Sequence, residues 1–259
     1  MGFFFFGLGA ITGSFLNVCI VRLPQEKSIV FPGSHCPHCK KPIAWYDNIP
    51  LISWLLLRGR CRSCKAPFSF RYWLVEFITA CVFAFFYYYY GLSWVLLPYL
   101  VMLCGFIVAT FVDFEHRIIP DEVSLGGIAA GLVLSFFIPQ LHHVDSSLMA
   151  LGLSALGVLV GGGSIYLMGM LGDFLFKKES MGGGDVKLLG MVGAFLGWKL
   201  ALLAFFVAPF FGAGFGIVEK IRTKDSTIAY GPFLVLGSLV SMFWGEFIIH
   251  WIINGYALP

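Results

Sequence analysis

Charged residues are scarce in this chain. Asp, Glu, Lys and Arg make up only 12% of its 259 residues, whereas hydrophobic residues make up 59%. Both values lie far outside the range of soluble globular domains. The few charges form neither an acidic tail nor a broad basic face, so no nucleic-acid partner is predicted. A chain of this composition is expected to lie in a lipid bilayer.

Hydrophobic runs long enough to cross a bilayer recur along the whole chain. Eight candidates are found, at residues 2–21, 72–90, 92–112, 123–140, 147–172, 187–198, 200–218 and 227–253. The sixth run is too short to span comfortably, so we interpret it as a partial helix joined to the next through Trp198 and Lys199, with seven spans as the alternative. The sequence predicts an all-α polytopic membrane protein of about eight transmembrane helices.

Basic residues predict which side of the membrane each loop faces. The loop at 22–71 holds 9 of the 17 Lys and Arg residues, which indicates a cytoplasmic loop. With eight alternating spans, the other basic residues except Lys199 fall on the same side: Arg117, Lys177, Lys178, Lys187, Lys220, Arg222 and Lys224. Both termini then lie outside, with Tyr87 to Tyr90 and Trp94 at the headgroup level.

The cytoplasmic loop carries two CxxC pairs. Cys36 and Cys39 form the first, Cys61 and Cys64 the second, and 21 residues separate the pairs. Four thiolates in this arrangement are the ligand set of a closed tetrahedral zinc site. A redox pair or disulfides would be the alternative, but a cytoplasmic loop is a reducing environment. We therefore predict a structural zinc ion that supplies part of the folding energy of a loop with little core.

Carboxylates are rare in membrane helices, so each is a candidate functional group. Asp113 ends the third span and Asp185 begins the sixth, and the predicted topology places both at the cytoplasmic edge. Two carboxylates a few ångströms apart share one proton, so one can act as a base on water while the other protonates a leaving group. This is the chemistry of an aspartic protease. From the residues alone, ion pairs with Arg117 or Lys187 explain these aspartates equally well.

Glycines precede the second aspartate. Gly182 to Gly184 permit close backbone approach just before Asp185 opens a helix. Free backbone amides at that helix end predict that Asp185 is the more acidic member of the pair and that Asp113 holds the shared proton. Asp121 follows Pro120 and is interpreted as a helix cap rather than as a catalytic group.

These motifs together resemble those of bacterial type IV prepilin peptidases, the GxGD class of membrane aspartic proteases. The resemblance covers nearly the whole chain. Residues 13–24 are similar to the family's first-helix signature and residues 36–64 to its tetracysteine domain. Asp113 with residues 119–121, and residues 182–189, resemble its two catalytic motifs. The set is specific, whereas a lone GxGD would be a weak signal.

The resemblance implies a catalytic pair and its surroundings. Asp113 and Asp185 would be catalytic, and the supporting residues would be Gly182, Gly183, Gly184 and Lys187. The chain would comprise a first transmembrane helix at 1–21, a tetracysteine domain at 22–71 related to methyl transfer, and a peptidase domain at 72–259.

The resemblance also implies an activity and a place. The protein would remove the short basic leader of type IV prepilins or secretion pseudopilins on the cytoplasmic side of the bacterial inner membrane. It would then methylate the new N-terminal residue with S-adenosylmethionine. Methyl transfer rests on the resemblance alone, because no donor-binding fingerprint is present. The pilin served, the oligomeric state and the donor-binding residues are not predicted.

Two other classes of protein share some of these features. A proton-coupled transporter also places carboxylates in membrane helices, but near the midplane on broken helices. A zinc-dependent structural assembly protein would explain the cysteines and leave the aspartates without a role. The predicted position of the aspartate pair at the cytoplasmic edge favours the peptidase.

Overall fold

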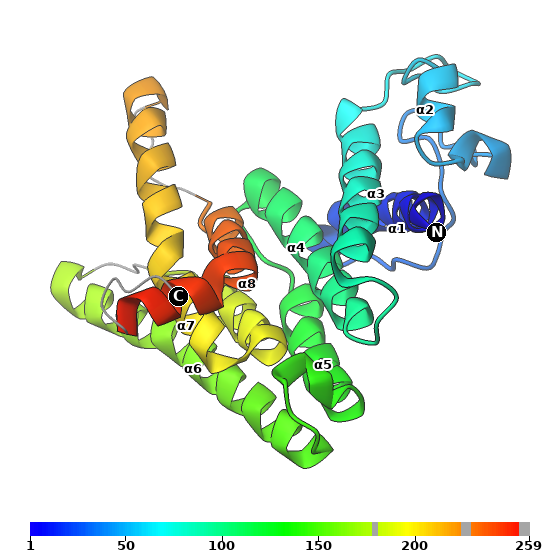
Figure 1. Ribbon diagram of the computed structural model, residues 1–259. Coiled ribbons are helices and arrows are strands. Elements are labelled where there is room, and N and C mark those ends of the chain that lie inside the picture. Colours follow the sequence, from blue (N-terminus) through cyan, green and yellow to red (C-terminus); the bar gives the residue numbers. More distant parts are fainter. Residues whose placement is uncertain (178–180, 224–228, 254–259) are drawn as a thin grey trace. The chain divides into compact units, whose positions relative to one another are not determined.

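The computed structural model describes residues 1–177, 181–223 and 229–253, without the side chains of 176 and 215–223. Within these ranges the chain is helical and contains no β-strand (Figure 1). It divides into two compact units, Met1–Leu96 and Leu97–Pro259. Lys178 and Lys224, and the side chains of Lys220 and Arg222, lie outside the described residues.

Two long helices form the frame of the first unit. α1 (Gly2–Arg22) packs along α3 (Phe70–Tyr90). The two backbones approach closely at two glycines of α1. A Cβ atom at Gly9 would lie 2.7 Å from Ala80 Cα, and one at Gly13 would lie 2.7 Å from Glu76 Cα. Small residues at these positions therefore allow the helix pair to form.

The loop between these helices contains only short helical elements. They are η1 (Leu23–Gln25), η2 (Trp45–Asn48) and α2 (Ile52–Leu56). Ser69 then caps α3, because its side chain accepts a hydrogen bond from the backbone N–H of Arg71 at 3.2 Å. The predicted membrane helix therefore begins at Phe70, two residues before the predicted start.

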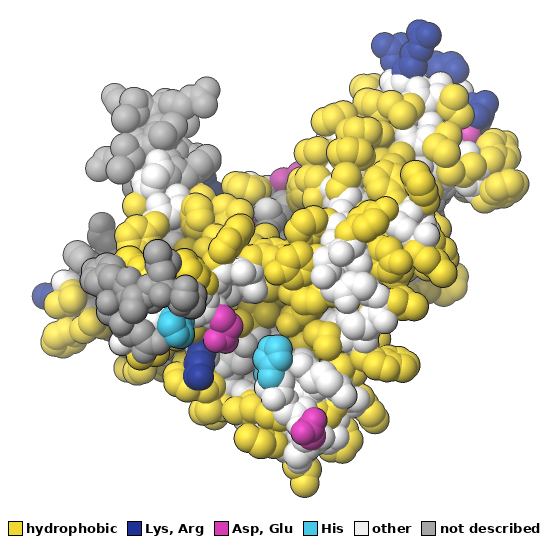
Figure 2. All heavy atoms as spheres, viewed as in Figure 1, with side chains coloured by type: hydrophobic (Ala, Val, Ile, Leu, Met, Phe, Trp, Pro, Cys, Tyr) yellow, Lys and Arg dark blue, Asp and Glu magenta, His cyan; other side chains and the backbone are white. Residues whose placement is uncertain are grey.

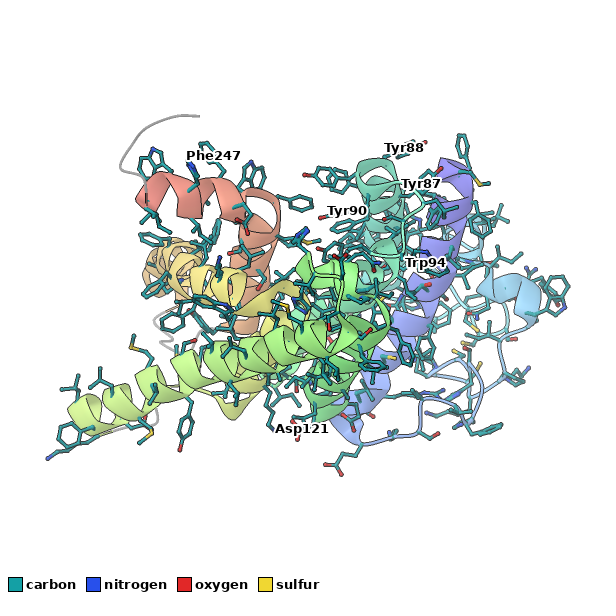
Figure 3. The ribbon with its side chains drawn as sticks, turned by 60° about the horizontal axis from the view of Figure 1, so that its bottom comes forward. Tyr87, Tyr88, Tyr90, Trp94, Asp121 and Phe247 are labelled. Atoms are coloured by element: carbon teal, nitrogen blue, oxygen red, sulfur yellow. The ribbon has the colours of Figure 1, made fainter. Side chains whose placement is uncertain are left out.

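An aromatic cluster closes the other end of α3. Tyr87, Tyr88 and Tyr90 lie together there, and the helix ends at Gly91 with a positive φ of 63° (Figure 3). Tyr88 is 73% exposed, and Trp94 in the following turn is 79% exposed. Exposed Tyr and Trp rings at a helix end suit a headgroup layer.

The second unit is built around α7 (Gly183–Thr223). The helices α5 (Asp121–Phe137), α6 (Ser147–Phe176) and α8 (Gly231–Ile253) pack against it. α4 (Leu96–His116) precedes them, and η3 (Pro139–His142) joins α5 to α6. α7 has a largely buried first half, which includes Leu188, Met191, Val192 and Phe195.

α6 and α7 touch backbone to backbone. A Cβ atom at Gly193 would collide with the carbonyl group of Gly157, and one at Gly157 would collide with the carbonyl group of Gly193. Gly131 of α5 similarly faces Ala194 and Phe195. These contacts agree with the close packing that small residues permit in membrane helices.

α7 is two helices joined at a break. Gly197 has φ 78° and ψ 170°, values that are not helical, and only glycine adopts them readily. The carbonyl oxygen of Ala194 near this break accepts hydrogen bonds from Ser154 at 2.7 Å and Ser135 at 3.4 Å. Hydroxyl groups from α5 and α6 therefore satisfy backbone at the break.

These helices confirm the predicted all-α polytopic fold. Among the described residues, six helices are long and apolar enough to cross a membrane. α5, with 17 residues, is slightly shorter, and α7 counts as one although its break at Gly197 separates the two runs predicted at 187–198 and 200–218. Every predicted hydrophobic run therefore corresponds to a helix or to half of α7.

The Gly157–Gly193 contact predicts a selective loss of stability. Gly193→Ala should destabilise the fold by about 1–3 kcal/mol, because the added methyl group overpacks a backbone contact. Thermal unfolding in detergent measures the effect. Gly152→Ala, in the partner helix α6 with open space where the added Cβ would lie, is the control and should not destabilise the protein. Equal unfolding temperatures for the two variants would contradict the packing described.

Candidate active site

Asp113 is a buried carboxylate near the end of α4. The residue is only 5% exposed. The oxygen Oδ2 accepts a hydrogen bond of 2.8 Å from the backbone N–H of Gly231, the first residue of α8. The positive end of the α8 dipole therefore faces this carboxylate.

Asp185 is the third residue of α7 and is half-buried. Its backbone N–H donates to the carbonyl oxygen of Gly182 at 3.1 Å, which forms a turn at the helix start. A Cβ atom at Gly182 would lie 3.3 Å from Asp185 Oδ2. The glycine before the helix therefore leaves room beside the carboxylate, as the motif predicted.

Ile119 connects the surroundings of the two aspartates. A Cβ atom at Gly184, next to Asp185, would lie 3.1 Å from Ile119 Cβ. A Cβ atom at Gly231 would lie 3.2 Å from Ile119 Cδ1 and 2.8 Å from Asp113 Oδ2. The carboxylates of Asp113 and Asp185 are close enough to interact electrostatically. The fold thus brings the predicted pair together across 72 positions of the chain.

Lys187 pairs with a different acid. Its Nζ atom lies 2.6 Å from Asp121 Oδ1, and both side chains are partly exposed. The prediction that Asp121 caps α5 is wrong. Pro120 occupies the cap position without a side-chain hydrogen bond, and Asp121 is the first helical residue. The Asp121 carboxylate is directed to α7 instead, where the ion pair joins the starts of α5 and α7.

Sequence reasoning missed two neighbours of the aspartate pair. One is the backbone N–H of Gly231, and the other is Tyr230, which precedes it. The Tyr230 hydroxyl is buried and has no hydrogen-bond partner among the described residues. Burial and the charge of Asp185 raise the pKa of Tyr230 to about 12. No sequence signal marks either residue, because both matter only through the approach of α8 to α4.

Both aspartates have a backbone donor. The expectation that Asp185 is the more acidic member rested on donors at the start of α7, and the Gly182 N–H there bonds the Asp185 carboxylate. The Gly231 N–H at the start of α8 gives Asp113 a donor of the same kind. That Asp113 holds the shared proton stays a prediction for titration, since interacting carboxylates ionise as a pair.

The four cysteines of the loop in the first unit form one cluster. Their Sγ atoms all lie within 4.8 Å of one another. Cys36 lies 3.8 Å from Cys64, and Cys39 lies 4.0 Å from Cys61. A tetrahedral zinc ion with bonds of 2.3 Å holds its sulfur ligands about 3.8 Å apart. The cluster therefore fits a metal ion of this kind.

The two CxxC knuckles have the same backbone design. Lys40 N–H donates to Cys36 O at 2.9 Å, and Lys65 N–H donates to Cys61 O at 3.0 Å. Both lysines have positive φ values, 60° and 62°. All four thiols are free of disulfides. Hydrogen bonds from backbone amides, Cys64 first, lower the pKa of Cys61 to about 6, whereas the pKa of the neighbouring Cys64 is raised to about 11. Cys61 is therefore the thiol that loses its proton most readily in this cluster.

Comparison with known proteins covers both units. Residues 8–90 match the Bacterial Peptidase A24 N-terminal domain, and residues 100–217 match the Type IV leader peptidase family. A prepilin leader peptidase/N-methyltransferase of Legionella pneumophila is 34% identical over 93% of this chain and 91% of its own length. The chain belongs to the type IV leader peptidase family.

The chain covers different shares of the length of its other relatives. A prepilin leader peptidase/N-methyltransferase of Myxococcus xanthus (strain DK1622) is 40% identical over 85% of this chain but only 63% of its own length. A type 4 prepilin-like proteins leader peptide-processing enzyme of Escherichia coli O78:H11 is 33% identical over 91% of each chain. No solved structure matches the chain. The family resemblance read from the motifs is confirmed.

The position of Tyr230 predicts a measurable charge coupling. In this family member, Asp185→Asn should lower the pKa of the Tyr230 phenol from about 12, because the phenolate no longer faces a negative carboxylate. Ultraviolet difference titration against the Tyr230→Phe variant isolates this phenol, and return to neutral pH checks that the protein stays folded. An unchanged Tyr230 titration in Asp185→Asn would mean that the two groups lie apart.

Proposed function

We propose that this protein is a prepilin leader peptidase and N-methyltransferase whose catalytic pair is Asp113 and Asp185. The observation that carries the proposal is the approach of these two acids at the starts of α7 and α8 and the end of α4. The relatives described as prepilin leader peptidases support the substrate class. We also propose secretion pseudopilins as substrates, because the family resemblance implies both classes.

The geometry supports aspartic-protease chemistry with one proton shared by the pair. The ionised carboxylate takes a proton from water as the water oxygen bonds to the scissile carbonyl carbon, and the protonated partner gives its proton to the carbonyl oxygen. The resulting diol collapses as the C–N bond breaks. The leaving nitrogen takes the proton that came from water, and the other aspartate recovers its proton from a diol hydroxyl.

The surrounding residues hold this pair in place. Gly231 N–H orients Asp113 through its 2.8 Å hydrogen bond. An extended substrate peptide can reach Asp185 because the residues before it, Gly182, Gly183 and Gly184, carry no side chains. Lys187 acts as a positioning residue, since its ion pair with Asp121 fixes the start of α7.

The position of the pair within the helices opposes the transporter alternative. Asp113 lies three residues from the end of α4, and Asp185 is the third residue of α7. At 1.5 Å per residue, each lies within about 5 Å of a helix end, whereas transporter sites lie near the bilayer midplane. We place this end on the cytoplasmic side of the bacterial inner membrane, because the loop at 22–71 holds 9 of the 17 basic residues.

We further propose that Cys36, Cys39, Cys61 and Cys64 hold a structural zinc ion. Four cysteines close the coordination shell, so the ion has no open position for a substrate. Its contribution is to fold the loop at 22–71, which the described structure builds mostly from turns.

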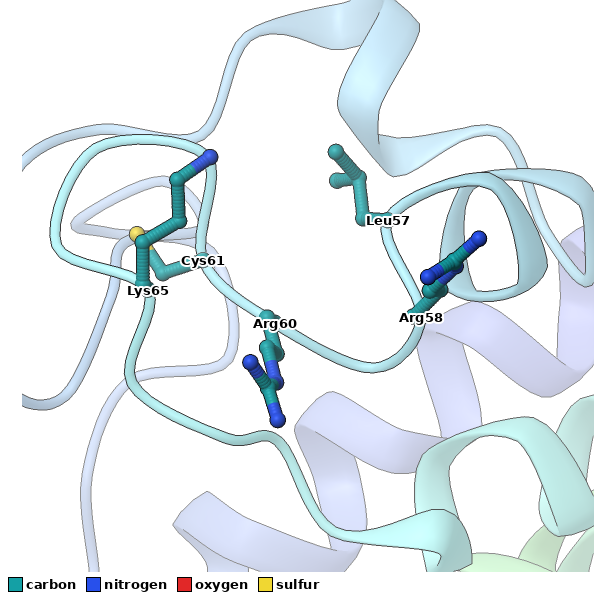
Figure 4. Close-up of a pocket in the computed structure, with 5 residues that line it drawn as sticks. All are labelled: Leu57, Arg58, Arg60, Cys61 and Lys65. Atoms are coloured by element: carbon teal, nitrogen blue, oxygen red, sulfur yellow. The ribbon is translucent and has the colours of Figure 1, made fainter.

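The methyl donor implied by the family is S-adenosylmethionine. The described pocket in the first unit has a volume of about 390 Å³ and is lined by Leu57, Arg58, Arg60, Cys61 and Lys65 (Figure 4). Its three cations match the carboxylate of the donor but oppose its sulfonium and ammonium groups. The pocket therefore does not fit this molecule, and no donor-binding residue is assigned.

The catalytic proposal predicts the loss of leader cleavage on substitution of either aspartate. Asp113→Asn and Asp185→Asn should each lower the cleavage rate by about 10²–10⁴-fold, because each removes one proton-transfer group. The mass of a purified prepilin before and after incubation measures cleavage. Asp145→Asn, an exposed change between η3 and α6, is the control and should cleave normally. Substantial cleavage by either aspartate variant would show that Asp113 and Asp185 are not the catalytic pair.

The metal proposal predicts about one zinc ion per purified chain. Cys36→Ser should reduce the zinc content to near zero and lower the resistance of the 22–71 loop to proteolysis, because the tetrahedral site loses a ligand. Cys81→Ser removes an exposed thiol from α3 and should leave both properties unchanged. Elemental analysis decides the matter: a metal-free wild-type protein with fully reduced cysteines would exclude a resident zinc site.

A further inference from the structure

The loop of the first unit exposes large apolar side chains on two neighbouring short helices, η2 and α2. Trp45 is 80% exposed and Leu56 is 78% exposed. The hydroxyl of Ser53 in α2 donates to the carbonyl oxygen of Tyr46 in η2 at 2.9 Å, which holds the two helices together. We call these exposed side chains the apolar ridge: Trp45, Tyr46, Ile52, Leu55 and Leu56.

Contacts with α3 fix the depth of this ridge relative to a membrane-spanning helix. The backbone N–H of Leu51, just before α2, donates to Glu76 Oε2 at 2.7 Å. The Trp54 ring of α2 lies 5.5 Å from the Phe70 ring and 6.4 Å from the Trp73 ring. Glu76 is six residues into α3, or about 9 Å along its axis. α2 therefore lies beside the first two turns of a helix that crosses the bilayer.

A basic pocket follows α2 directly. Its lining includes Arg58, Arg60 and Lys65, and the pocket volume is about 390 Å³. No hydrogen bond or ion pair to a described residue engages these three side chains, all of which are exposed. Figure 2 shows dark-blue Lys and Arg side chains gathered at this end of the first unit, with yellow hydrophobic side chains beside them. The pocket thus has an uncompensated positive charge next to exposed apolar groups.

We propose that the pocket binds the phosphate of an anionic phospholipid while the apolar ridge inserts among its acyl chains. A lipid supplies both the negative charge that three cations require and the apolar layer that the ridge requires, whereas a soluble anion leaves the ridge in water. Trp and Tyr favour the headgroup layer, and clustered Lys and Arg favour anionic lipids. The pocket and the ridge share no residue with the aspartate pair, so the proposal does not depend on the proposed peptidase activity.

The test compares lipid binding by the full-length protein and two matched triple variants. The first, Arg58→Gln with Arg60→Gln and Lys65→Gln, removes the pocket cations. The control, Lys27→Gln with Lys40→Gln and Lys41→Gln, removes the same charge elsewhere in the loop, and Lys40 is the counterpart of Lys65 in the other knuckle. Native mass spectrometry in detergent measures binding of phosphatidylglycerol and of phosphatidylcholine.

We expect the wild type to prefer phosphatidylglycerol and the pocket variant to bind it about 100-fold more weakly, given the contribution of each cation near an anionic surface. The control should stay within about threefold of the wild type. Equal losses in both variants, or equal binding of the two lipids by the wild type, would overturn the proposal. Equal metal content in both variants verifies that the loop is folded.

A variant of the apolar ridge tests whether the ligand of the pocket is a lipid or a soluble phosphate compound. Leu56→Gln leaves the three cations in place and should weaken binding of phosphatidylglycerol by about tenfold, because one large side chain leaves the acyl layer. It should leave displacement by glycerol phosphate unchanged. If millimolar glycerol phosphate displaces the lipid completely and Leu56→Gln has no effect, the pocket is a site for soluble anions and the lipid proposal is wrong.

Discussion

Burial of the Asp113 carboxylate is the constraint on which the second unit depends. A carboxylate removed from water is costly unless hydrogen-bond donors replace the lost solvation. The described structure meets this cost with the backbone N–H of Gly231, so the start of α8 must come within 2.8 Å of the end of α4. A side chain at Gly231 would displace the Asp113 carboxylate, because a Cβ atom would lie 2.8 Å from Asp113 Oδ2. A single backbone hydrogen bond thereby sets the approach of two helices 118 residues apart in sequence.

The first unit solves a different problem, because its loop has few residues to bury. The paired CxxC knuckles gather four sulfur atoms at metal-binding distances. The chain then turns at Gly59, whose φ is 63°, against the ring of Trp54. Trp54 in turn packs on Phe70 and Trp73 of α3. Thiol ligands and aromatic packing therefore replace the hydrophobic core that a domain of this size lacks.

Much of the architecture could be predicted because membrane helices and metal knuckles leave local patterns. Long uncharged runs predicted the helices, and the spacing of Cys36, Cys39, Cys61 and Cys64 predicted the cluster. The sequence predicted a partial helix joined to the next through Trp198 and Lys199, and the structure has the join between the two halves of α7 at Gly197. The assignment of Asp121 as a cap failed because its carboxylate finds Lys187, 66 positions away. Local propensity could not anticipate that partner. Tyr230 was missed for the same reason, since only tertiary packing sets its burial.

The break at Gly197 has a consequence for the membrane itself. The half of α7 that carries Asp185 runs from Gly183 to the residue before Gly197, which amounts to about 21 Å at 1.5 Å per residue. A bilayer has a hydrocarbon core of about 30 Å. Because this half-helix is largely buried among α5, α6 and α8, the shortfall is met by protein and not by lipid. Its far end stays within the apolar layer, where the Ser154 hydroxyl bonds the carbonyl oxygen of Ala194. The neighbouring helices, and not the surrounding lipid, therefore set the depth at which Asp185 lies.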